Sequence, residues 1–277
     1  MKVYGSIVLY NTSIDELKRA IDSFTKSKII EKKLILIDNS PTDKLKICKD
    51  LNENIEYIFN NSNIGFGAGH NIALKKSIKE NADFHVVINP DISSTSDVIT
   101  PMVSFLVDHV DVGMMMPKVI NSDGSLQHLP KLLPTPIGML LRKTKFPKFV
   151  YNNFIEKYEL RSYSETMIYE APILSGCFSV IRVNNLKKIG LYDDKFFMYF
   201  EDWDISRRMH QISKTIYFPE VTVIHDYESG ANHNSKLFKI FVKSAVHYFS
   251  KWGWFFDFER KKINNQTLSQ FYKKSEK

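Results

Sequence analysis

The stretch of the chain with the clearest chemical potential runs from Lys195 to Arg208 and has the sequence KFFMYFEDWDISRR. Six aromatic or methionine side chains stand there beside three carboxylates, those of Glu201, Asp202 and Asp204. A carboxylate against an apolar wall is partly desolvated, which raises its pKa toward the range that a general base requires. The stretch therefore indicates proton-transfer chemistry.

The same stretch also has a purely structural interpretation. It would be a buried aromatic strand end that leads into a helix with an acidic first turn, which the helix dipole favours. Asp204 would then form an ordinary helix ion pair with Arg207 or Arg208, three and four residues further on. The rest of the sequence has to separate the two interpretations.

The elements before this stretch alternate between strands and helices. Four short apolar runs have the pattern of buried strands: residues 3–10, 34–37, 55–59 and 84–88. Helical patterns follow the first and the third of these runs, and the first helix has capping-box spacing at its start. The alternation predicts an α/β fold with a mostly parallel central sheet.

Beyond residue 96 the alternation becomes less regular. We predict helices over residues 97–107 and 183–189, and strands over residues 112–117, 173–181, 215–218 and 221–225. Pro117 is expected to end its strand and Gly190 its helix. Residues 121–170 break the pattern, and we expect this region to be mobile or to face a partner.

Polar residues follow each of the first four predicted strands. They are Asn11, Asp38, Asn60 and Asp91. In a parallel α/β sheet, ligands bind outside the carboxyl ends of the strands. One polar strand end is merely a turn, but four on one sheet edge predict a binding site.

The glycine-rich segment GFGAG, residues 65–69, does not fit a dinucleotide fingerprint. It does not follow the first strand, and His70 stands where the third glycine of that motif belongs. The glycines, Gly65 among them, are better explained by a backbone that approaches a ligand closely. Asn71 lies at the start of the helix that follows.

The side chains at two strand ends could bind a divalent cation. Asp91 follows one predicted strand, and His225 ends another. One carboxylate, one imidazole and two diphosphate oxygens would give an octahedral Mg²⁺ or Mn²⁺ site completed by water. The sequence does not show that the two side chains meet.

Composition and cysteine content suit a protein of the reduced cytoplasm. The 277 residues can form one large domain or two small ones, and the only two cysteines, Cys48 and Cys177, have no metal-type spacing. The N-terminal apolar run is too short for a signal peptide, and no run approaches the roughly 20 residues of a membrane span. We therefore predict neither export nor a transmembrane segment.

The net charge of +7 belongs to the C-terminal tail. Ten of the 38 basic residues and only three of the 31 acidic residues lie from Lys236 onward, so the remainder is neutral. A basic groove for nucleic acid across the fold is therefore not expected. The tail's aromatics also form one stripe and are not interleaved along a strand-binding groove.

The tail has the pattern of an amphipathic helix. Its apolar stripe comprises Leu237, Phe241, Ser244, Tyr248, Trp252 and Phe255, with Phe249 and Phe256 beside it. The other side comprises Lys236, Lys239, Lys243, His247 and Lys251. Such a helix suits a membrane interface. It equally suits docking on the protein's own core or contact with a second subunit.

Taken together, these motifs resemble the family 2 glycosyltransferases of the GT-A fold, and within them the bacterial rhamnosyltransferase-like branch. The resemblance extends from Val3 to about Gly230. Its parts are IVLYN at 7–11, IDNS at 37–40, NIGF at 63–66 with Asn71, INPD at 88–91, GCF at 176–178 through Arg182, FFMYFEDWD at 196–204 and His225. It implies a Rossmann-like domain that binds a nucleotide sugar.

The resemblance implies a division of labour along the chain. Residues 1–235 would form the transferase domain, with a donor-nucleotide half at 1–95 and an acceptor half at 96–235. Residues 236–277 would form the helical tail, as a membrane-association or dimer element. On the donor side, Tyr10, Asn11 and Asp38 would hold the pyrimidine base. Asn71 would lie near the base or ribose, and Gly65 near the donor.

The resemblance also implies roles in catalysis. Asp91 matches the last residue of the family's D-x-D metal motif, with Asn89 in place of the first aspartate, and His225 matches the C-terminal metal ligand. Asp202 matches the catalytic base, and Glu201 would orient the base or the acceptor. The acceptor side would be lined by Gly176, Cys177 and Trp203.

The expected function is metal-dependent inverting transfer, most simply of rhamnose from dTDP-rhamnose to a lipid-linked or surface polysaccharide acceptor. The expected location is the cytoplasmic face of the inner membrane. A UDP-hexose donor, such as UDP-galactose or UDP-glucose, is an alternative within the same fold. A nucleotide-sugar-binding scaffold without turnover is the alternative outside enzymes.

Overall fold

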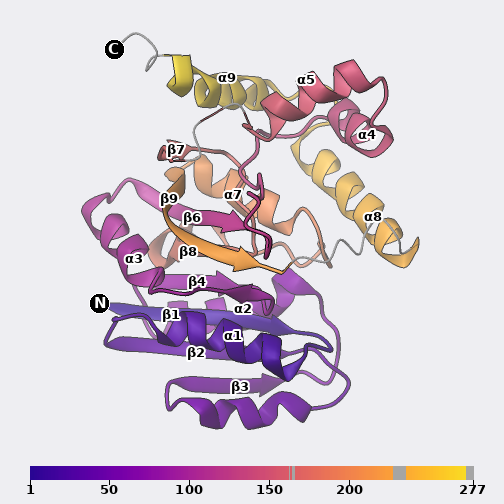
Figure 1. The fold of residues 1–277 in the computed structure, drawn as a ribbon. Coiled ribbons are helices and arrows are strands. Elements are labelled where there is room, and N and C mark those ends of the chain that lie inside the picture. Colours follow the sequence, from indigo (N-terminus) through magenta and orange to yellow (C-terminus); the bar gives the residue numbers. More distant parts are fainter. Residues whose placement is uncertain (162, 164–165, 227–234, 273–277) are drawn as a thin grey trace.

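A nine-stranded sheet forms the centre of the protein, here as a computed structural model that describes residues 1–161, 163, 166–226 and 235–272 (Figure 1). The strands are β1 (Lys2–Leu9), β2 (Glu31–Asp38), β3 (Ile55–Phe59), β4 (Phe84–Ile88), β5 (Ile92–Ser93), β6 (Val112–Ile120), β7 (Tyr169–Glu170), β8 (Phe178–Arg182) and β9 (Lys214–His225). Their order is β3-β2-β1-β4-β8-β6-β9-β5, with β7 beside β9.

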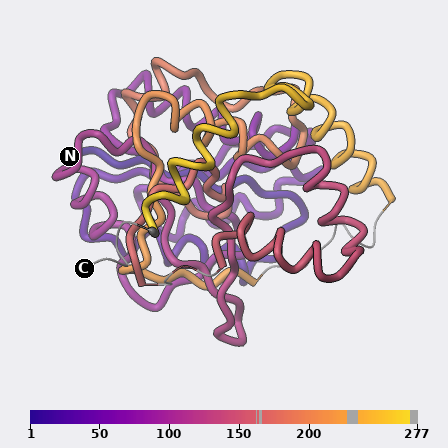
Figure 2. Tube along the Cα trace, turned by 90° about the horizontal axis from the view of Figure 1, so that it is seen from above, coloured from indigo at the N-terminus to yellow at the C-terminus, as the bar shows by residue number. Residues whose placement is uncertain are grey.

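Helices pack around the sheet and extend beyond it. They are α1 (Ile14–Thr25), α2 (Phe66–Lys79), α3 (Ile99–Asp108), α4 (Pro136–Thr144), α5 (Lys148–Tyr158), α6 (Val183–Ile189), α7 (Glu201–His210), α8 (Ser235–Trp252) and α9 (Phe258–Tyr272), with a 3₁₀ helix at Lys44–Leu51. Figures 1 and 2 place α4, α5 and α8 together on one side of the molecule.

The sheet is mostly parallel, as predicted. Strands β1 to β4 are parallel to one another, and β6 is parallel to β9. Strand β8 runs antiparallel between β4 and β6 and joins the two parallel parts. The N-terminal strands are buried on both faces: in β2, Leu34 and Leu36 pack in the core cluster that contains Leu17 of α1, whereas Ile35 and Ile37 pack with Ala73 of α2.

Three sequence predictions of element ends were wrong. Strand β6 continues through Pro117 to Ile120, because the register shift at Pro117 and Lys118 accommodates the missing amide hydrogen. The predicted strand 173–181 is shortened to β8, with Ile173 in a single bridge to Lys131. The two predicted strands at 215–225 form one strand, β9. Helix α6, by contrast, ends as predicted before Gly190.

The helical tail docks on the protein's own core. Ser244, Tyr248 and Phe249 of α8 are buried, and Phe241 and Tyr248 lie with ring centroids 5.2 and 5.5 Å from that of Phe200. The predicted apolar stripe is therefore covered by protein, apart from Phe255, which lies beyond the end of α8 and is exposed. Within the described residues, no helix is both long enough and apolar enough to cross a bilayer.

Candidate active site

The segment before α7 is a tight turn, and the predicted aromatic strand end is absent. Tyr199 and Phe200 both adopt left-handed backbone conformations, with φ of 71° and 69°. This conformation is unfavourable for bulky residues and is maintained only where packing enforces it. Burial of Phe200 and a hydrogen bond from Ser244 Oγ to the carbonyl of Met198 (2.8 Å) supply that packing. The turn directs Glu201 and Asp202 into the interior.

Two backbone amides hold the Asp202 carboxylate. The amide of Gly176 donates to Oδ2 at 3.2 Å, and the amide of Trp203 donates to Oδ1 at 2.9 Å. Gly176 makes this approach possible, since a Cβ there would lie 3.2 Å from the ring of Phe66 and 3.3 Å from Asp202 Cβ. The two amides thus fix the orientation of the Asp202 carboxylate.

Burial raises the pKa of both carboxyl groups in this pair. The effect on Glu201 is large because burial desolvates its carboxyl group, and the neighbouring Asp202 charge adds repulsion. The pKa of Asp202 is also raised by burial, but the amides of Gly176 and Trp203 and the positive charge of Lys131 oppose the shift. These contacts therefore favour the charged form of Asp202 over that of Glu201.

Lys131 was not predicted from the sequence as a site residue, because it lies in the irregular region. Its side chain is buried, and its ammonium lies 3.6 Å from Glu159, which also binds Arg142 and Arg161. Desolvation lowers the pKa of Lys131 to about 8, against the opposing effect of Glu159. A lone lysine between prolines gives no periodic signal, so only the fold shows that its charge acts on Asp202.

Asp204 is structural, as predicted, but its contacts extend beyond its own helix. Arg208 Nε lies 2.8 Å from Asp204 Oδ2, and Lys251 Nζ lies 2.8 Å from Oδ1. The indole of Trp252 donates to the same carboxylate at 2.9 Å. The proposed Arg207 partner instead forms a bidentate pair with Asp257, with both bonds at 2.8 Å. These carboxylates fasten the tail to α7.

Asp91 and His225 meet at the carboxyl ends of β4 and β9. Antiparallel pairing of Ile92 with His225 brings them together, with His225 Nε2 3.3 Å from Asp91 Oδ1. Gln127 fixes the imidazole: its Nε2 donates to the His225 carbonyl (3.0 Å), and its Oε1 faces Nδ1 at 2.9 Å. The Nδ1 hydrogen therefore points to Gln127, and Nε2 offers a lone pair toward Asp91.

This pair fits a divalent cation. Asp91 Oδ1 is buried and has no hydrogen-bond donor among the described residues, and it faces a second lone pair at His225. Two acceptors in such proximity are unfavourable without a cation or proton between them. No group of three or more His, Cys, Asp or Glu side chains occurs within the described chain to complete a site. The described residues thus offer these two ligands, and the diphosphate oxygens and water expected above would supply others.

The same sheet edge gathers the residues predicted to hold the nucleotide. Tyr10 is half-exposed at the end of β1, and the amide of Asn11 donates to Ser40 Oγ at 2.9 Å. Asp38 is fully buried: the amide of Ser40 donates to its Oδ1 at 2.9 Å, and the Tyr57 hydroxyl donates to Oδ2 at 2.6 Å. Asp38 therefore lies beneath the surface of this sheet edge and holds Ser40 and Tyr57 in place.

The glycine segment links the donor edge to the aromatic turn. Gly65 has φ of +92°, and a Cβ there would lie 2.3 Å from the carbonyl oxygen of Phe197, so only glycine fits. The amide of Phe66 donates to the same carbonyl at 2.9 Å. This contact joins two segments more than 130 positions apart in the sequence.

Asn71 braces α2 and offers no free amide hydrogen to a ligand. Its Nδ2 donates to the carbonyl of Tyr192 at 2.9 Å and to Asp194 Oδ1 at 2.7 Å, while its Oδ1 accepts from the amide of Tyr192 at 3.0 Å. The side chain is buried. In this structure Asn71 therefore supports the loop at 192–194, and its predicted place near the base or ribose stays a prediction.

Gly176 and Cys177 lie between the Asp91–His225 pair and Asp202. The amide of Asn89 donates to the Cys177 carbonyl at 2.7 Å, which places segment 176–177 across the end of β4. The Cys177 thiol is buried, and burial raises its pKa to about 12, so it is not a nucleophile. Trp203 packs with its ring centroid 4.5 Å from that of Phe200 and contributes to the aromatic wall.

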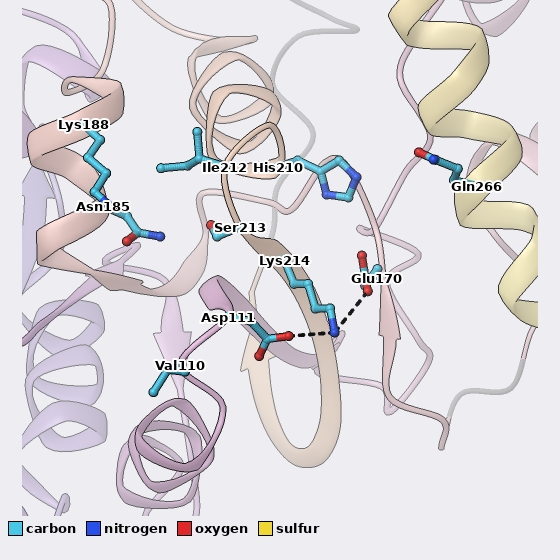
Figure 3. Close-up of a pocket in the computed structure, with 10 residues that line it drawn as sticks. All are labelled: Val110, Asp111, Glu170, Asn185, Lys188, His210, Ile212, Ser213, Lys214 and Gln266. Carbon is cyan, nitrogen blue, oxygen red and sulfur yellow. Dashed lines mark ion pairs between the residues drawn. The ribbon is translucent and has the colours of Figure 1, made fainter.

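A hollow of about 440 Å³ lies at the opposite edge of the sheet, where β6 and β9 begin (Figure 3). It is lined by charged and polar side chains, including Lys188 and His210, and Lys214 bridges Asp111 and Glu170 there at 2.7 and 3.9 Å. None of the predicted site residues borders it. The amino ends of the strands are also not where α/β sheets bind ligands.

The fold and the candidate site together indicate the class of protein. The mostly parallel α/β sheet has the fold of the GT-A glycosyltransferases, and solved structures of that class share it. GalNAc-T7 with UDP, GalNAc and Mn²⁺ matches 91% of this chain and 48% of its own, with a TM-score of 0.65 and 19% identity. Staphylococcus aureus TarS 1–349 with UDP matches 97% and 71%, with a TM-score of 0.59 and 13% identity.

The chain belongs to glycosyl transferase family 2, which it matches over residues 6–190. Among curated relatives, an N-acetylglucosaminyl-diphospho-decaprenol L-rhamnosyltransferase of Mycobacterium tuberculosis is 24% identical over 69% of this chain and 66% of its own. The rhamnosyltransferase WbbL of Escherichia coli is 25% identical over 79% and 82%. The chain thus spans just under two thirds of the mycobacterial relative. Asp202 and His225 lie beyond the family match, so their assignment depends on geometry.

Proposed function

We propose that the protein is an inverting glycosyltransferase that moves rhamnose from dTDP-rhamnose to a saccharide acceptor carried on a lipid. The observation that carries this proposal is the Asp202 carboxylate, half-buried, oriented by two amides and linked through segment 176–177 to the Asp91–His225 pair. The M. tuberculosis and E. coli relatives are both rhamnosyltransferases by name, which supports rhamnose as the sugar, and the name of the former supports a diphospho-lipid acceptor.

The reaction would be an in-line displacement at the anomeric carbon. Asp202 accepts the proton of the acceptor hydroxyl as its oxygen attacks that carbon, and the bond from the carbon to the diphosphate oxygen breaks. Because the raised pKa of Asp202 makes it a stronger base than an exposed carboxylate, burial serves the step. The raised pKa of Glu201 disfavours a second negative charge in the site. No covalent intermediate is needed, and one base suffices.

Asp91 and His225 would hold Mg²⁺ or Mn²⁺. Such a cation stabilises the negative charge on a departing diphosphate. The residues of this chain would contribute one carboxylate oxygen and one imidazole nitrogen, and the contact of Nδ1 with Gln127 leaves Nε2 as the nitrogen that faces Asp91. Asn89 stands beside the pair, with its amide nitrogen 3.4 Å from His225 Nε2.

The donor can be identified by ligand-induced stabilisation. With Mn²⁺ present, dTDP-rhamnose is expected to raise the midpoint of thermal unfolding, since a ligand that binds only the native state stabilises it by mass action. UDP-glucose and UDP-galactose serve as comparison ligands, and dTDP separates recognition of the nucleotide from recognition of the sugar. A shift with UDP-sugars alone would replace the donor by a UDP-hexose. Donor binding without transfer or hydrolysis under any condition would favour the scaffold.

Metal dependence has its own test. Replacing Gln127 by Leu should weaken Mn²⁺ binding by about 10- to 100-fold, because the imidazole loses the partner that fixes its tautomer. Isothermal titration with Mn²⁺ and dTDP measures this directly, and EDTA should stop turnover of the parent protein. Gln211→Leu is the matched control, since Gln211 bonds Glu259 on the surface. Equal Mn²⁺ affinity in both variants would contradict the assignment.

A further inference from the structure

The region from Thr135 to Val150, which lies within the irregular part of the sequence, forms an exposed apolar arm. Helix α4, the turn into α5 and the first turn of α5 present Ile137, Leu140, Phe146 and Phe149 to solvent, and each of these side chains is at least 64% exposed. Met139 and Gly138 face the core instead. Large apolar side chains gathered on a surface usually mark a binding site for a partner or a membrane.

Helix α8 continues this surface with a second apolar row. Phe238, Val242 and Val246 are spaced four residues apart and are exposed, on the side of α8 away from the buried Ser244 and Tyr248. This row differs from the stripe predicted in the sequence, which packs on the core. Lys239 and Lys243 form the adjacent row.

Contacts between side chains and backbone hold α4, α8 and the turn after α8 next to one another. Lys143 of α4 lies over the ring of Phe238, 4.7 Å from its centroid. Arg260 bonds both the carbonyl of Pro134 (3.2 Å), just before α4, and that of Phe255 (3.5 Å). The turn carries four exposed aromatics: Trp254, Phe255, Phe256 and Phe258. We name these exposed residues of α4, the α4–α5 turn, α8 and segment 254–258 the basic apolar face.

The charge of this face has one sign. Residues 135–150 contain four basic residues and no acidic one, and α8 contains four lysines and no acidic residue. Arg142 and Lys251 bind Glu159 and Asp204 in the protein. Lys143, Lys145, Lys148, Lys239 and Lys243 remain around the apolar side chains, and aromatic side chains with a basic border suit the headgroup region of an anionic bilayer.

We propose that the basic apolar face docks the protein on an anionic phospholipid bilayer. The aromatics of segment 254–258 and the α4–α5 turn enter the headgroup region, and the lysines contact lipid phosphates. A second copy of the chain is a poorer occupant, because two such faces would oppose charges of the same sign.

The face is connected to the proposed base. Lys251 and Trp252 of α8 bind Asp204, two residues from Asp202, and Ser244 bonds the turn that precedes α7. If the proposed function holds, this docking brings Asp202 to a membrane that carries the lipid-linked acceptor. Lipid binding itself does not depend on that function.

Vesicle sedimentation with the full chain tests the proposal. The protein should bind vesicles of phosphatidylglycerol and phosphatidylcholine, bind phosphatidylcholine alone weakly, and lose affinity as salt is raised. Phe255→Ser with Phe256→Ser should reduce binding to anionic vesicles at least about tenfold. Lys239→Gln with Lys243→Gln should reduce it about fivefold per lysine. All four residues are exposed, so the variants should fold.

The matched control is Ile30→Ser with Val110→Ser, which removes two exposed apolar side chains 98% and 79% accessible near the amino ends of β2 and β6. This control should bind as the parent does. Equal loss in the control, or equal binding to neutral and anionic vesicles, would overturn the proposal. So would a concentration-dependent dimer that the Phe255/Phe256 variant abolishes. Transfer to a water-soluble acceptor should survive the Phe255/Phe256 change, so absence of transfer in the parent would count against the proposed function alone.

Discussion

Replacement of Asp202 by Asn is expected to reduce sugar transfer by about 100- to 10,000-fold while donor binding persists. An amide cannot accept the acceptor proton at neutral pH, and a positioned general base contributes about that factor. The fold should survive because Asn retains an oxygen for the amide of Gly176 or Trp203. Transfer rate and donor-induced thermal shift measure the two effects separately.

Asp111→Asn is the matched control for this change. Asp111 is an exposed carboxylate paired with Lys214 at the opposite edge of the sheet, so its loss should leave transfer nearly unchanged. The pH profile supplies a second readout. Burial raises the pKa of Asp202 to about 6, and only the ionised form is a base, so the parent's rate should rise with pH up to about 6 and level off above it. Near-normal transfer by Asp202→Asn would remove Asp202 as the base.

Replacement of Arg207 by Met is expected to lower the free energy of unfolding by about 3–5 kcal/mol. Both Arg207 and Asp257 are almost completely buried and joined by two hydrogen bonds of 2.8 Å. Removal of the guanidinium leaves the Asp257 carboxylate in the interior with only Arg260 nearby, at 3.7 Å. Urea unfolding followed by circular dichroism measures the change.

Lys46→Met tests whether the expected loss of stability depends on burial of the Arg207–Asp257 ion pair. Lys46 pairs with Asp43 at 3.9 Å, and both side chains are more than half exposed. Such a pair contributes at most about 1 kcal/mol, so its loss should be small. An Arg207→Met variant as stable as the Lys46 variant would show that the tail does not depend on this ion pair.

Local signals in the sequence were sufficient for most of the fold. The β-rich runs and the Ser13–Glu16 capping box specify β1 to β4 and the start of α1, because side-chain periodicity and caps act over a few residues. Pro117 misled because a register shift, which depends on the neighbouring strand, absorbs it. The aromatic run at 196–200 misled because its left-handed turn is enforced by α8, a distant element.

The residue types of the candidate site could be predicted from the sequence, whereas the contacts between those residues could not. The sequence suggested Asp91 and His225, but their meeting depends on the antiparallel pairing of β5 with β9. Gln127 and Lys131 carry no local signal, since each acts through a residue about 70 to 100 positions away. Asn71 has the expected place at the start of a helix, yet its hydrogen bonds hold the loop at 192–194. Long-range pairing therefore decides which polar residues face a ligand.

The close contact of Gly65 and Phe66 with the Phe197 carbonyl bears on how members of this family can be recombined. The contact lies on the seam between the donor half and the acceptor half that we predict, and it requires glycine on one side and a tightly turned backbone on the other. A chimera that takes its first 95 residues from one relative and the remainder from another would have to match both sides of this seam. If the halves are swapped to exchange donor specificity, residues 195–200 therefore have to come from the same relative as the glycine segment.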